Sequence, residues 1–416
     1  MKPELVSPAG NFVSLRAAID AKADAVYFGI DEFNLRKNAG NFSPKSIKEI
    51  VRLCHINKVR SYLTLNSIIY DKEINRVRKI LTEAKKAGID AVIAWDFAII
   101  LLCNELYIPV HLSTQASISN FTALSFLKEN IRNLKCIVLA RELSLEKISY
   151  IIKKIKEHSM QIEIETFVHG AMCMSISGRC FLSHELFNKS ANRGECMQPC
   201  RRKYLLTEKE DNYQLELGSD FILSTRDICT LPFIDKLIKS GISKFKIEGR
   251  NRSPEYVKAV TECYRFAIDS AIKNQLSRDL IDSLLKKLKE VYNRGFSSGF
   301  YLGMPSAMEH ANEHGSIATT RKLYIGTVRN FYNKIGVAEV RIDTGSLNIG
   351  DIIMFQGETT GIVEIKISSM QINHKDIQTS TKGETVAIKI PCIVRRNDKV
   401  YLKLSNNKNA THSSIL

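Results

Sequence analysis

Four of the ten cysteines are grouped in one short stretch of the chain. Two lie in HGAMCMSISGRC and two in GECMQPC: Cys173, Cys180, Cys196 and Cys200. Soft thiolate ligands in such a set suit zinc or an iron–sulfur cluster. Zinc ribbons use C-x-x-C pairs, which this sequence lacks, whereas iron–sulfur ligation tolerates wider spacings and a neighbouring proline, as in QPC. The spacing therefore favours an iron–sulfur cluster, with zinc and with buried or redox-active thiols as alternatives.

The other cysteines are expected to be structural. Free cysteine packs as a small apolar side chain, and five of them lie in apolar or helical patterns: Cys54, Cys103, Cys136, Cys263 and Cys392. Cys229, in STRDICTLP, is the ambiguous one and is kept as a fifth candidate ligand outside the main set.

Two residues near the first cysteine are candidates for acid–base chemistry. His169 lies four residues before Cys173, and Glu165 lies four residues before His169 in IEIETFVHG. Histidine titrates near neutral pH, so His169 is a candidate acid, base or hydrogen-bond donor. The alternative is a histidine that only orients the cysteine loop. Because side chains alternate along a strand, Glu165 and His169 are expected to share one face.

The elements that position these residues repeat one theme over the first 250 residues. Short runs rich in β-branched residues alternate with longer amphipathic segments, and the runs cover residues 4–8, 25–29, 60–66, 91–96, 109–115, 136–143, 162–170 and 244–249. Segments such as 75–88 carry apolar residues at helical spacing and end in glycine. Eight such units predict a closed, parallel, TIM-like β/α barrel of the α/β class. A doubly wound open sheet is the alternative.

Polar residues gather at the C-terminal ends of these runs. They are Asn66, Asp96, Gln115, Arg141, Glu142, His169, Glu248 and Arg250. A β/α barrel brings these strand ends together on its catalytic face. The alternative for each residue is that it only caps the following helix.

The chain is expected to contain a barrel, an insertion and a second domain. Residues 171–243 are longer than a crossover helix needs, so we read them as a cysteine-rich insertion in a barrel domain over 1–320. Short alternating strands punctuated by glycines then predict a small all-β barrel over 321–405, followed by a flexible tail over 406–416.

The charge balance points to a polyanionic partner. Sixty basic residues against 44 acidic ones give a formal charge of +16, which favours nucleic acid first and anionic membrane second. The alternative is a compositional bias. The sequence contains no apolar stretch long enough for a membrane span and no apolar signal region, so a cytoplasmic protein with reduced cysteines is expected.

The stretch ETFVHGAMCMSISGRCFLS (165–183) resembles the signature of peptidase family U-32, the collagenase-like proteases. Flanking pieces fit the same family: ELVSPAG, HLSTQAS, LARELSLEKI, NRGECMQPCRRKY, LSTRDI and FKIEGRNRSPEYV. The resemblance runs through nearly the whole chain, including the small C-terminal barrel.

This resemblance implies a specific chemistry. Members of the family include iron–sulfur proteins that hydroxylate RNA or quinone precursors without molecular oxygen. The best match is the tRNA branch, which makes 5-hydroxyuridine at the wobble position with prephenate as hydroxyl donor. The resemblance then implies one four-iron four-sulfur cluster on Cys173, Cys180, Cys196 and Cys200, tRNA as partner, and a paralogous subunit as a further candidate partner. Hydroxylation of a ribosomal RNA cytidine and peptidase activity are the alternatives.

The peptidase alternative has weak support from the residues. The H-E-x-x-H motif of metalloproteases is absent from the sequence. A thiol protease needs a cysteine next to a base, and Cys173 with His169 is the available pair. However, a thiolate bound to iron is not a free nucleophile.

Substrate binding is assigned to cationic and polar side chains. A dicarboxylate donor needs arginine forks, which makes Arg141, Arg179 and Arg250 the candidates, together with Gln115 and Glu248 at the same strand ends. An ion pair with Glu142 or Glu248 is the alternative for each arginine. The basic run after the last cysteine is expected to contact RNA phosphates with salt-dependent affinity: Arg201, Arg202 and Lys203.

Overall fold

Eight parallel strands close into a barrel in this computed structural model, which describes residues 2–37, 40–176, 178–204, 207, 210, 223–305, 310–311 and 315–406. The barrel strands are β1 (Glu4–Ala9), β2 (Ala25–Gly29), β3 (Arg60–Thr64), β4 (Ala91–Ala94), β5 (Val110–Leu112), β6 (Leu134–Val138), β7 (Glu163–Gly170) and β9 (Lys244–Ile247). They pair in chain order, and β9 closes the ring by pairing with both β7 and β1. The eight predicted runs and the TIM-like barrel are confirmed, and the open doubly wound sheet is excluded.

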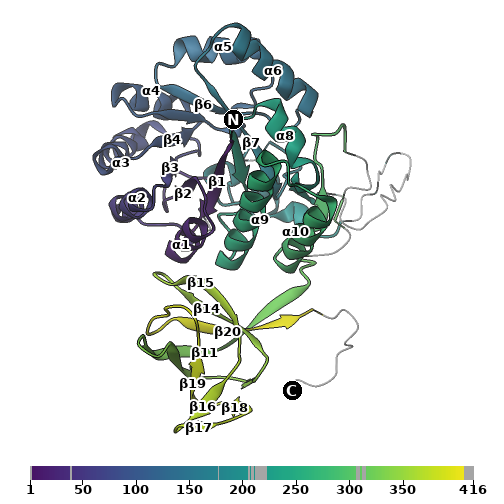
Figure 1. Cartoon of the computed structure of the whole chain (residues 1–416). Coiled ribbons are helices and arrows are strands. Elements are labelled where there is room, and N and C mark those ends of the chain that lie inside the picture. The colour runs from purple at the N-terminus through teal and green to yellow at the C-terminus, as the bar shows by residue number, and fades with distance from the viewer. Residues whose placement is uncertain are drawn as a thin grey trace.

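Helices surround this barrel (Figure 1). They are α1 (Phe12–Asp20), α2 (Ile47–Ile56), α3 (Ile74–Ala87), α4 (Phe97–Glu105), α5 (Phe121–Asn130), α6 (Leu145–Glu157), α8 (Ile234–Ser240), α9 (Pro254–Ile272) and α10 (Arg278–Glu290). Short 3-10 turns lie at Pro44–Ser46, Asp71–Glu73, Thr114–Ala116, Ala191–Arg193, Pro199–Arg201 and Leu231–Phe233. Helix α3 shows how the sequence pattern forms these helices. Its apolar stripe is buried against the barrel, and its C-cap is Gly88, whose φ of +83° suits glycine.

The cysteine-rich insertion adds elements that the sequence pattern did not indicate. Helix α7 (Leu182–Phe187) lies inside it. Strand β8 (Asp227–Cys229) pairs antiparallel with the end of β7, outside the ring, and β10 (Phe296–Ser297) pairs with β8. These pairings hold the C-terminal end of β7 in place, and the first predicted ligand, Cys173, follows shortly after it.

The C-terminal part is all-β and antiparallel, as expected. Its main sheet runs in the order β15-β14-β20-β11-β12-β19-β16-β17, and β13 pairs with β18. The bounds are β11 (Thr320–Tyr332), β12 (Val337–Ile342), β13 (Ser346–Asn348), β14 (Ile352–Gly357), β15 (Gly361–Lys366), β16 (Met370–Ile372), β17 (Lys375–Asp376), β18 (Thr379–Thr381), β19 (Thr385–Lys389) and β20 (Lys399–Ser405). Within residues 315–406, no pairing joins the end strands β15 and β17, so hydrogen bonds do not close this sheet.

The all-β part packs against the outside of the barrel, next to α1 and α9 (Figure 1). Ala17 of α1 forms a small buried cluster with Met354 and Ile362. The Lys403 ammonium pairs with Glu290 of α10 at 3.0 Å. We retain 1–320 and 321–405 as proposed domain limits, and the proposed tail lies outside the described residues from 407 onward.

None of the helices in the described ranges is both long enough and apolar enough to cross a membrane.

Candidate functional site

All four predicted ligand cysteines line one cavity of about 180 Å³. Cys173 follows β7, Cys180 precedes α7, Cys196 lies in the following loop, and Cys200 lies in the turn Pro199–Arg201. Each of the four is partly exposed, whereas five of the other six cysteines are buried and the sixth, Cys392, lies in the all-β part. The structure therefore brings together the four thiols that the sequence pattern selected.

Contacts with the first third of the chain hold the cysteine loop in place. The Arg193 guanidinium donates to the Glu73 carboxylate at 2.5 and 2.8 Å and to the Ile68 carbonyl at 2.7 Å. Gly194 has a φ of +91°, and a side chain there would lie 2.2 Å from the Asn34 carbonyl oxygen. Glycine is therefore required where this loop meets the loop after β2.

The spacing of the sulfur atoms is wider than a zinc site requires. No three of the four cysteine sulfurs, all in the described part of the chain, lie within 4.8 Å of one another. Zn–S bonds of about 2.3 Å in a tetrahedron would place the sulfurs about 3.8 Å apart. A cluster attaches its thiolates to separate iron atoms, so the residues present fit an iron–sulfur group better than a single zinc ion.

The cavity is also electropositive. Four arginines and one carboxylate line it: Arg36, Arg201, Arg252, Arg294 and Glu248. Burial raises the pKa of the Cys200 thiol, Arg201 opposes that rise, and the other three cysteines add to it. A thiolate at Cys200 consequently gains from further positive charge, which metal ions bound to it would supply.

The three residues predicted to bind RNA separate into two groups. Arg201 is half-buried and donates to the Ser224 hydroxyl and the Thr225 carbonyl, each at 3.2 Å, so it braces the cavity wall. Arg202 and Lys203 are exposed, and the Arg202 guanidinium lies 4.7 Å from the Phe187 ring centroid. Only the latter two lie on the surface, as an RNA contact requires.

Four of the five residues predicted to bind substrate meet in a narrow pocket at the barrel mouth. This pocket of about 30 Å³ is lined by Gln115, Arg141, Glu248 and Arg250, and its other lining residues include Asn66, Arg36 and Lys246. It shares Arg36 and Glu248 with the cysteine cavity, so the two spaces have a common wall. The fifth, Arg179, is exposed elsewhere, and its guanidinium lies 4.5 Å from the Trp95 ring centroid.

Ion pairs organise this common wall. Arg36 Nη2 lies 3.0 Å from Glu248 Oε1, and Arg141 Nη2 lies 4.0 Å from Glu248 Oε2. Burial alone would raise the pKa of Glu248, but Arg36, Arg141 and Arg250 outweigh it, so the pKa is lowered and the carboxylate stays charged. The predicted alternative of an ion pair thus applies to Arg141, at the outer limit of distance.

Arg250 differs from its neighbours. It is 5% exposed, and among the described residues its guanidinium donates to the neutral Asn34 amide oxygen at 3.2 Å. No carboxylate among the described residues lies within 4.0 Å of it. Burial lowers the pKa of Arg250 to about 10, which leaves it charged at neutral pH. Glu248 favours the charged form of Arg250 from beyond ion-pair distance, and an anionic ligand in the pocket would stabilise that charge further.

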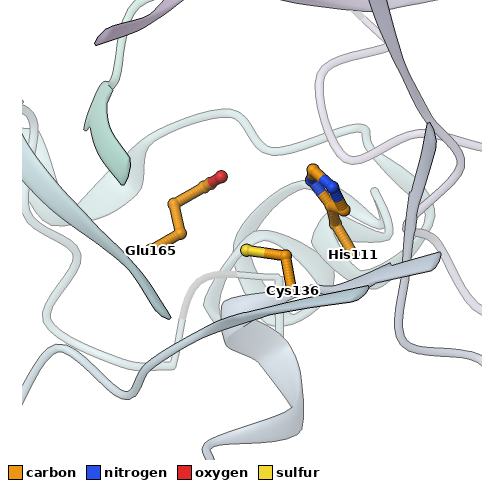
Figure 2. A group of neighbouring side chains, drawn as sticks. All are labelled: His111, Cys136 and Glu165. Atoms are coloured by element: carbon orange, nitrogen blue, oxygen red, sulfur yellow. The ribbon is translucent and has the colours of Figure 1, made fainter. Parts of the chain in front are cut away.

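Below the mouth pocket, the barrel interior holds a second polar group (Figure 2). His111, Cys136 and Glu165 point toward one another from β5, β6 and β7, with ligand atoms within 4.8 Å. They have the donor types of a metal site. However, Lys246 Nζ already lies 2.5 Å from Glu165 Oε1. Burial lowers the pKa of His111, and Lys244 and Lys246 lower it further. Because these lysines oppose a cation, we assign the group to the polar core.

His169 lies on the other side of β7. Its ring packs between Tyr264 and Phe296, with centroids 5.4 and 5.6 Å away, and Nδ1 lies 3.3 Å from the Tyr264 hydroxyl. The expectation that Glu165 and His169 share a face was wrong, because the β7–β9 register shifts between Phe167 and His169 and breaks the alternation. The structure therefore places His169 in the lining of neither cavity.

The buried His169 leads to a prediction about acid stability. Burial lowers the pKa of His169 to about 4, against about 6.5 in an unfolded chain. Unfolding therefore takes up a proton as the pH falls through this window, and stability is lost with it. Between pH 7.5 and 5.0 the expected loss in free energy of unfolding is about 2 kcal/mol. His169→Gln should remove this part of the loss, as measured by urea unfolding at both pH values. His158→Gln, on the surface, is the control, and equal pH dependence in the two variants would contradict the assignment.

The structure also shows the positions of Asp96 and Cys229, two further candidates from the sequence. Asp96 caps α4, because its carboxylate accepts from the Ala98 amide at 2.9 Å, as the capping alternative proposed. Cys229 is buried on β8, with its sulfur 3.8 Å from the Tyr264 hydroxyl and outside the four-cysteine cavity.

Sequence reasoning missed Arg36 and Lys246. Arg36 lies in the loop after β2, where nothing in NLRKNAGNF marks one basic residue above another. Lys246 did carry a signal, since a lysine between the buried Phe245 and Ile247 of a barrel strand must point into the interior.

Comparison with known proteins places this site in context. The model of Peptidase family U32 matches residues 10–311. A collagenase of Porphyromonas gingivalis is 40% identical over 405 residues, which cover 96% of this chain and 97% of the relative. A tRNA hydroxylation protein of Bacillus subtilis is 36% identical over 299 residues, 70% of this chain and 69% of the relative. A 23S rRNA 5-hydroxycytidine synthase of Escherichia coli is 38% identical over 275 residues, 65% of this chain and 40% of the relative.

Proposed function

Because the chain belongs to peptidase family U32, and relatives within it are named for RNA hydroxylation, we propose that it is an RNA-modifying hydroxylase with an iron–sulfur cluster. In its finer form, the proposal is oxygen-independent conversion of a tRNA wobble uridine to 5-hydroxyuridine, in the cytoplasm, with a dicarboxylate of the prephenate type as hydroxyl donor. A paralogous subunit is proposed as a further partner.

One observation carries the proposal: four cysteines and four arginines line a single cavity whose described lining contains no histidine. A thiol protease needs a thiol with a lowered pKa and an adjacent base. Here burial raises the pKa of Cys200. Burial also lowers the pKa of His169 to about 4, which makes it a weak base, and its ring faces α9. The arrangement suits ligation of a metal cluster better than nucleophilic attack.

One four-iron four-sulfur cluster would be held by the four cysteines of this cavity: Cys173, Cys180, Cys196 and Cys200. Such a group, when bound, supplies electron-transfer chemistry whose potential depends on nearby charge and solvent access. The protein residues supply that environment. Arg201 braces the loop, and Arg36 pairs with Glu248 in the wall toward the barrel mouth. The mouth pocket and the cysteine cavity therefore lie next to each other, as a donor site and a redox site require.

Arg250 is proposed as the anchor of one donor carboxylate, because the mouth pocket, of about 30 Å³, has room for such a group and not for the whole donor. Arg250 is a buried cation without a carboxylate partner among the described residues, and an arginine fork matches a carboxylate in two hydrogen bonds. Arg141 is the second candidate: its Nε is buried without a hydrogen-bond partner, and its guanidinium lies 4.0 Å from the Phe167 ring centroid. Gln115 and Glu248 would complete the pocket, and Glu248 would hold both Arg36 and Arg141 in place.

We expect Arg250→Lys to raise the donor concentration needed for half-maximal hydroxylation by about 10-fold or more, because lysine keeps the charge but loses the fork. Affinity for tRNA should stay unchanged. The measurement is initial rate against donor concentration, with binding followed separately by filter retention. Arg78→Lys, in an exposed ion pair on α3, is the matched control. Unchanged donor dependence in Arg250→Lys and in Arg141→Lys would remove this assignment and leave the cluster untouched.

RNA contact is proposed for Arg202 and Lys203, which are exposed beside the last cysteine. Phosphate contacts position an RNA without reading its sequence, and their contribution falls with salt along a linear log–log slope. Arg201 supports the same segment from inside. A ribosomal RNA cytidine is the alternative substrate, since the relative named for that reaction is 38% identical but is covered over only 40% of its length.

Peptidase activity is the second candidate function. It is favoured by the similarity to a collagenase and by a cysteine and a histidine that line the same cavity. The collagenase relative matches nearly the whole chain. Cys173 and His310 line a common cavity on the outer side of the cysteine loop, so a cysteine and a histidine do face one space there.

The deciding experiment compares the two activities in one preparation. The protein, purified without oxygen and reconstituted with iron and sulfide, is incubated with uridine-containing tRNA and donor, and nucleosides are analysed by mass spectrometry. A mass gain of one oxygen in uridine supports the proposal. Release of peptides from gelatin by the iron-free protein, lost in His310→Ala, with no change in any RNA, would overturn it in favour of the peptidase.

A further inference from the structure

A second cavity, of about 510 Å³, lies beside the cysteine loop. It shares Met172 and Cys173 with the four-cysteine cavity, so Cys173 forms part of the wall of both. Its volume lies within the range of small-molecule binding sites. A group seated in it would lie against the outer side of the proposed cluster.

The walls and rim of this cavity are unusually apolar for an exposed region. Phe300 lines it together with Met172 and Met304. Met304 is 86% exposed, and Met174 and Ile176 at the same cavity are 45% and 37% exposed. A contiguous group of exposed apolar side chains marks a binding surface. The ligand must therefore present apolar faces.

Three polar side chains at the same cavity have hydrogen-bonding capacity that the described residues do not use: Glu142, Arg226 and His310. Glu142 is exposed, and no cation among the described residues lies within 4.0 Å of it. Among the described residues, Arg226 donates one recorded hydrogen bond, from Nε to the His310 carbonyl at 3.2 Å. His310 Nδ1 is buried without a partner. The ligand must therefore also have a polar edge with both donors and acceptors.

An unstacked uracil base has both properties: two flat apolar faces and an edge with an N–H donor between carbonyl acceptors. A base inside a stacked helix hides its faces, whereas bases of single-stranded loops are splayed out and bound by stacking on aromatic side chains. Enzymes that modify a ring atom need this extruded state. Resting on the proposed function, we propose that this cavity receives the target uracil, with Phe300 as the stacking surface and Glu142 and Arg226 at its polar edge.

The test uses an anticodon-arm RNA with 5-fluorouridine at the wobble position, followed by fluorine NMR. Binding to the wild-type protein should shift the fluorine resonance. Phe300→Ala should abolish the shift and lower the hydroxylation rate constant kcat/KM for unmodified tRNA by about 10-fold or more. RNA affinity should stay within about 3-fold, because phosphate contacts supply most of it. Phe126→Ala, an exposed phenylalanine on α5, is the matched control.

A second variant, at the exposed rim of the cavity, keeps the proposal testable if Phe300→Ala does not fold. Met304→Glu changes a side chain that is 86% exposed and should also prevent the shift, whereas Met304→Leu should preserve it. A fluorine shift without any hydroxylated product would overturn the proposed function but support the base pocket. Normal hydroxylation and a normal shift in both Phe300→Ala and Met304→Glu would overturn the pocket and spare the function. Displacement of the RNA shift by a gelatin-derived peptide would assign the cavity to peptides and overturn the proposal.

Discussion

Replacing any one of Cys173, Cys180, Cys196 and Cys200 with serine is expected to remove iron and acid-labile sulfide together and to lower hydroxylation by more than about 100-fold. Loss of a group that merely orients a metal ligand already costs about 10- to 100-fold, so loss of a ligand should cost more. The four thiols line one cavity, so each variant removes one of the four ligands that the cluster would use. Iron, sulfide and visible absorbance of anaerobically prepared protein measure the first effect.

The control for this prediction is Cys392→Ser. Cys392 is partly exposed, like the four, but lies in the all-β part of the chain. It should keep full iron content and activity. Variants of the four-cysteine set that retain iron, or a wild-type protein that binds zinc alone under anaerobic conditions, would contradict the cluster.

Glu165→Gln is expected to lower the free energy of unfolding by about 3–5 kcal/mol, because it leaves the buried Lys246 ammonium without its carboxylate. Lys246 Nζ lies 2.5 Å from Glu165 Oε1, and the side chains are 4% and 0% exposed. Urea unfolding followed by fluorescence is well suited to this measurement, since Trp95, the chain's only tryptophan, lies at the end of β4 and reports the barrel.

A control variant and a double variant test whether the effect of Glu165→Gln comes from the buried ion pair. Asp235→Asn breaks the exposed Lys239–Asp235 pair on α8 and should cost less than about 0.5 kcal/mol. The double variant Glu165→Gln with Lys246→Met should recover much of the loss, since no charge is then left buried. A cost below about 1 kcal/mol for Glu165→Gln would mean that the pair is not the buried interaction described.

The barrel could be predicted from the sequence because its strands are buried on both faces. Runs such as 25–29 are continuous and apolar, which indicates parallel pairing, and eight of them close a ring. Strand β8 could not be predicted in this way, since it is three residues long and pairs outside the repeat. Its existence depends on the tertiary position of the end of β7.

The candidate site was predictable in its residue types and only partly in its geometry. The four cysteines line one cavity, and five of the eight predicted polar strand ends line the mouth pocket. The position of His169 could not be derived, because a single register shift after Phe167 turns its side chain to α9. Arg36 was equally hidden, since its role depends on a loop whose conformation is set by contacts with a segment about 150 residues away, including Gly194.

The closure of the barrel by β9 has a consequence for biosynthesis. Strand β9 bonds to both β1 and β7, so the ring stays open on the ribosome until residue 247 has emerged. The cysteine stretch ends at Cys200 and therefore leaves the exit tunnel first, with its docking loop after β2 already made. During that interval the thiols are accessible to a cofactor-delivery system, while two strand edges remain free to pair with other nascent chains. Slow translation between residues 200 and 247 would lengthen both the opportunity for loading and the exposure to aggregation.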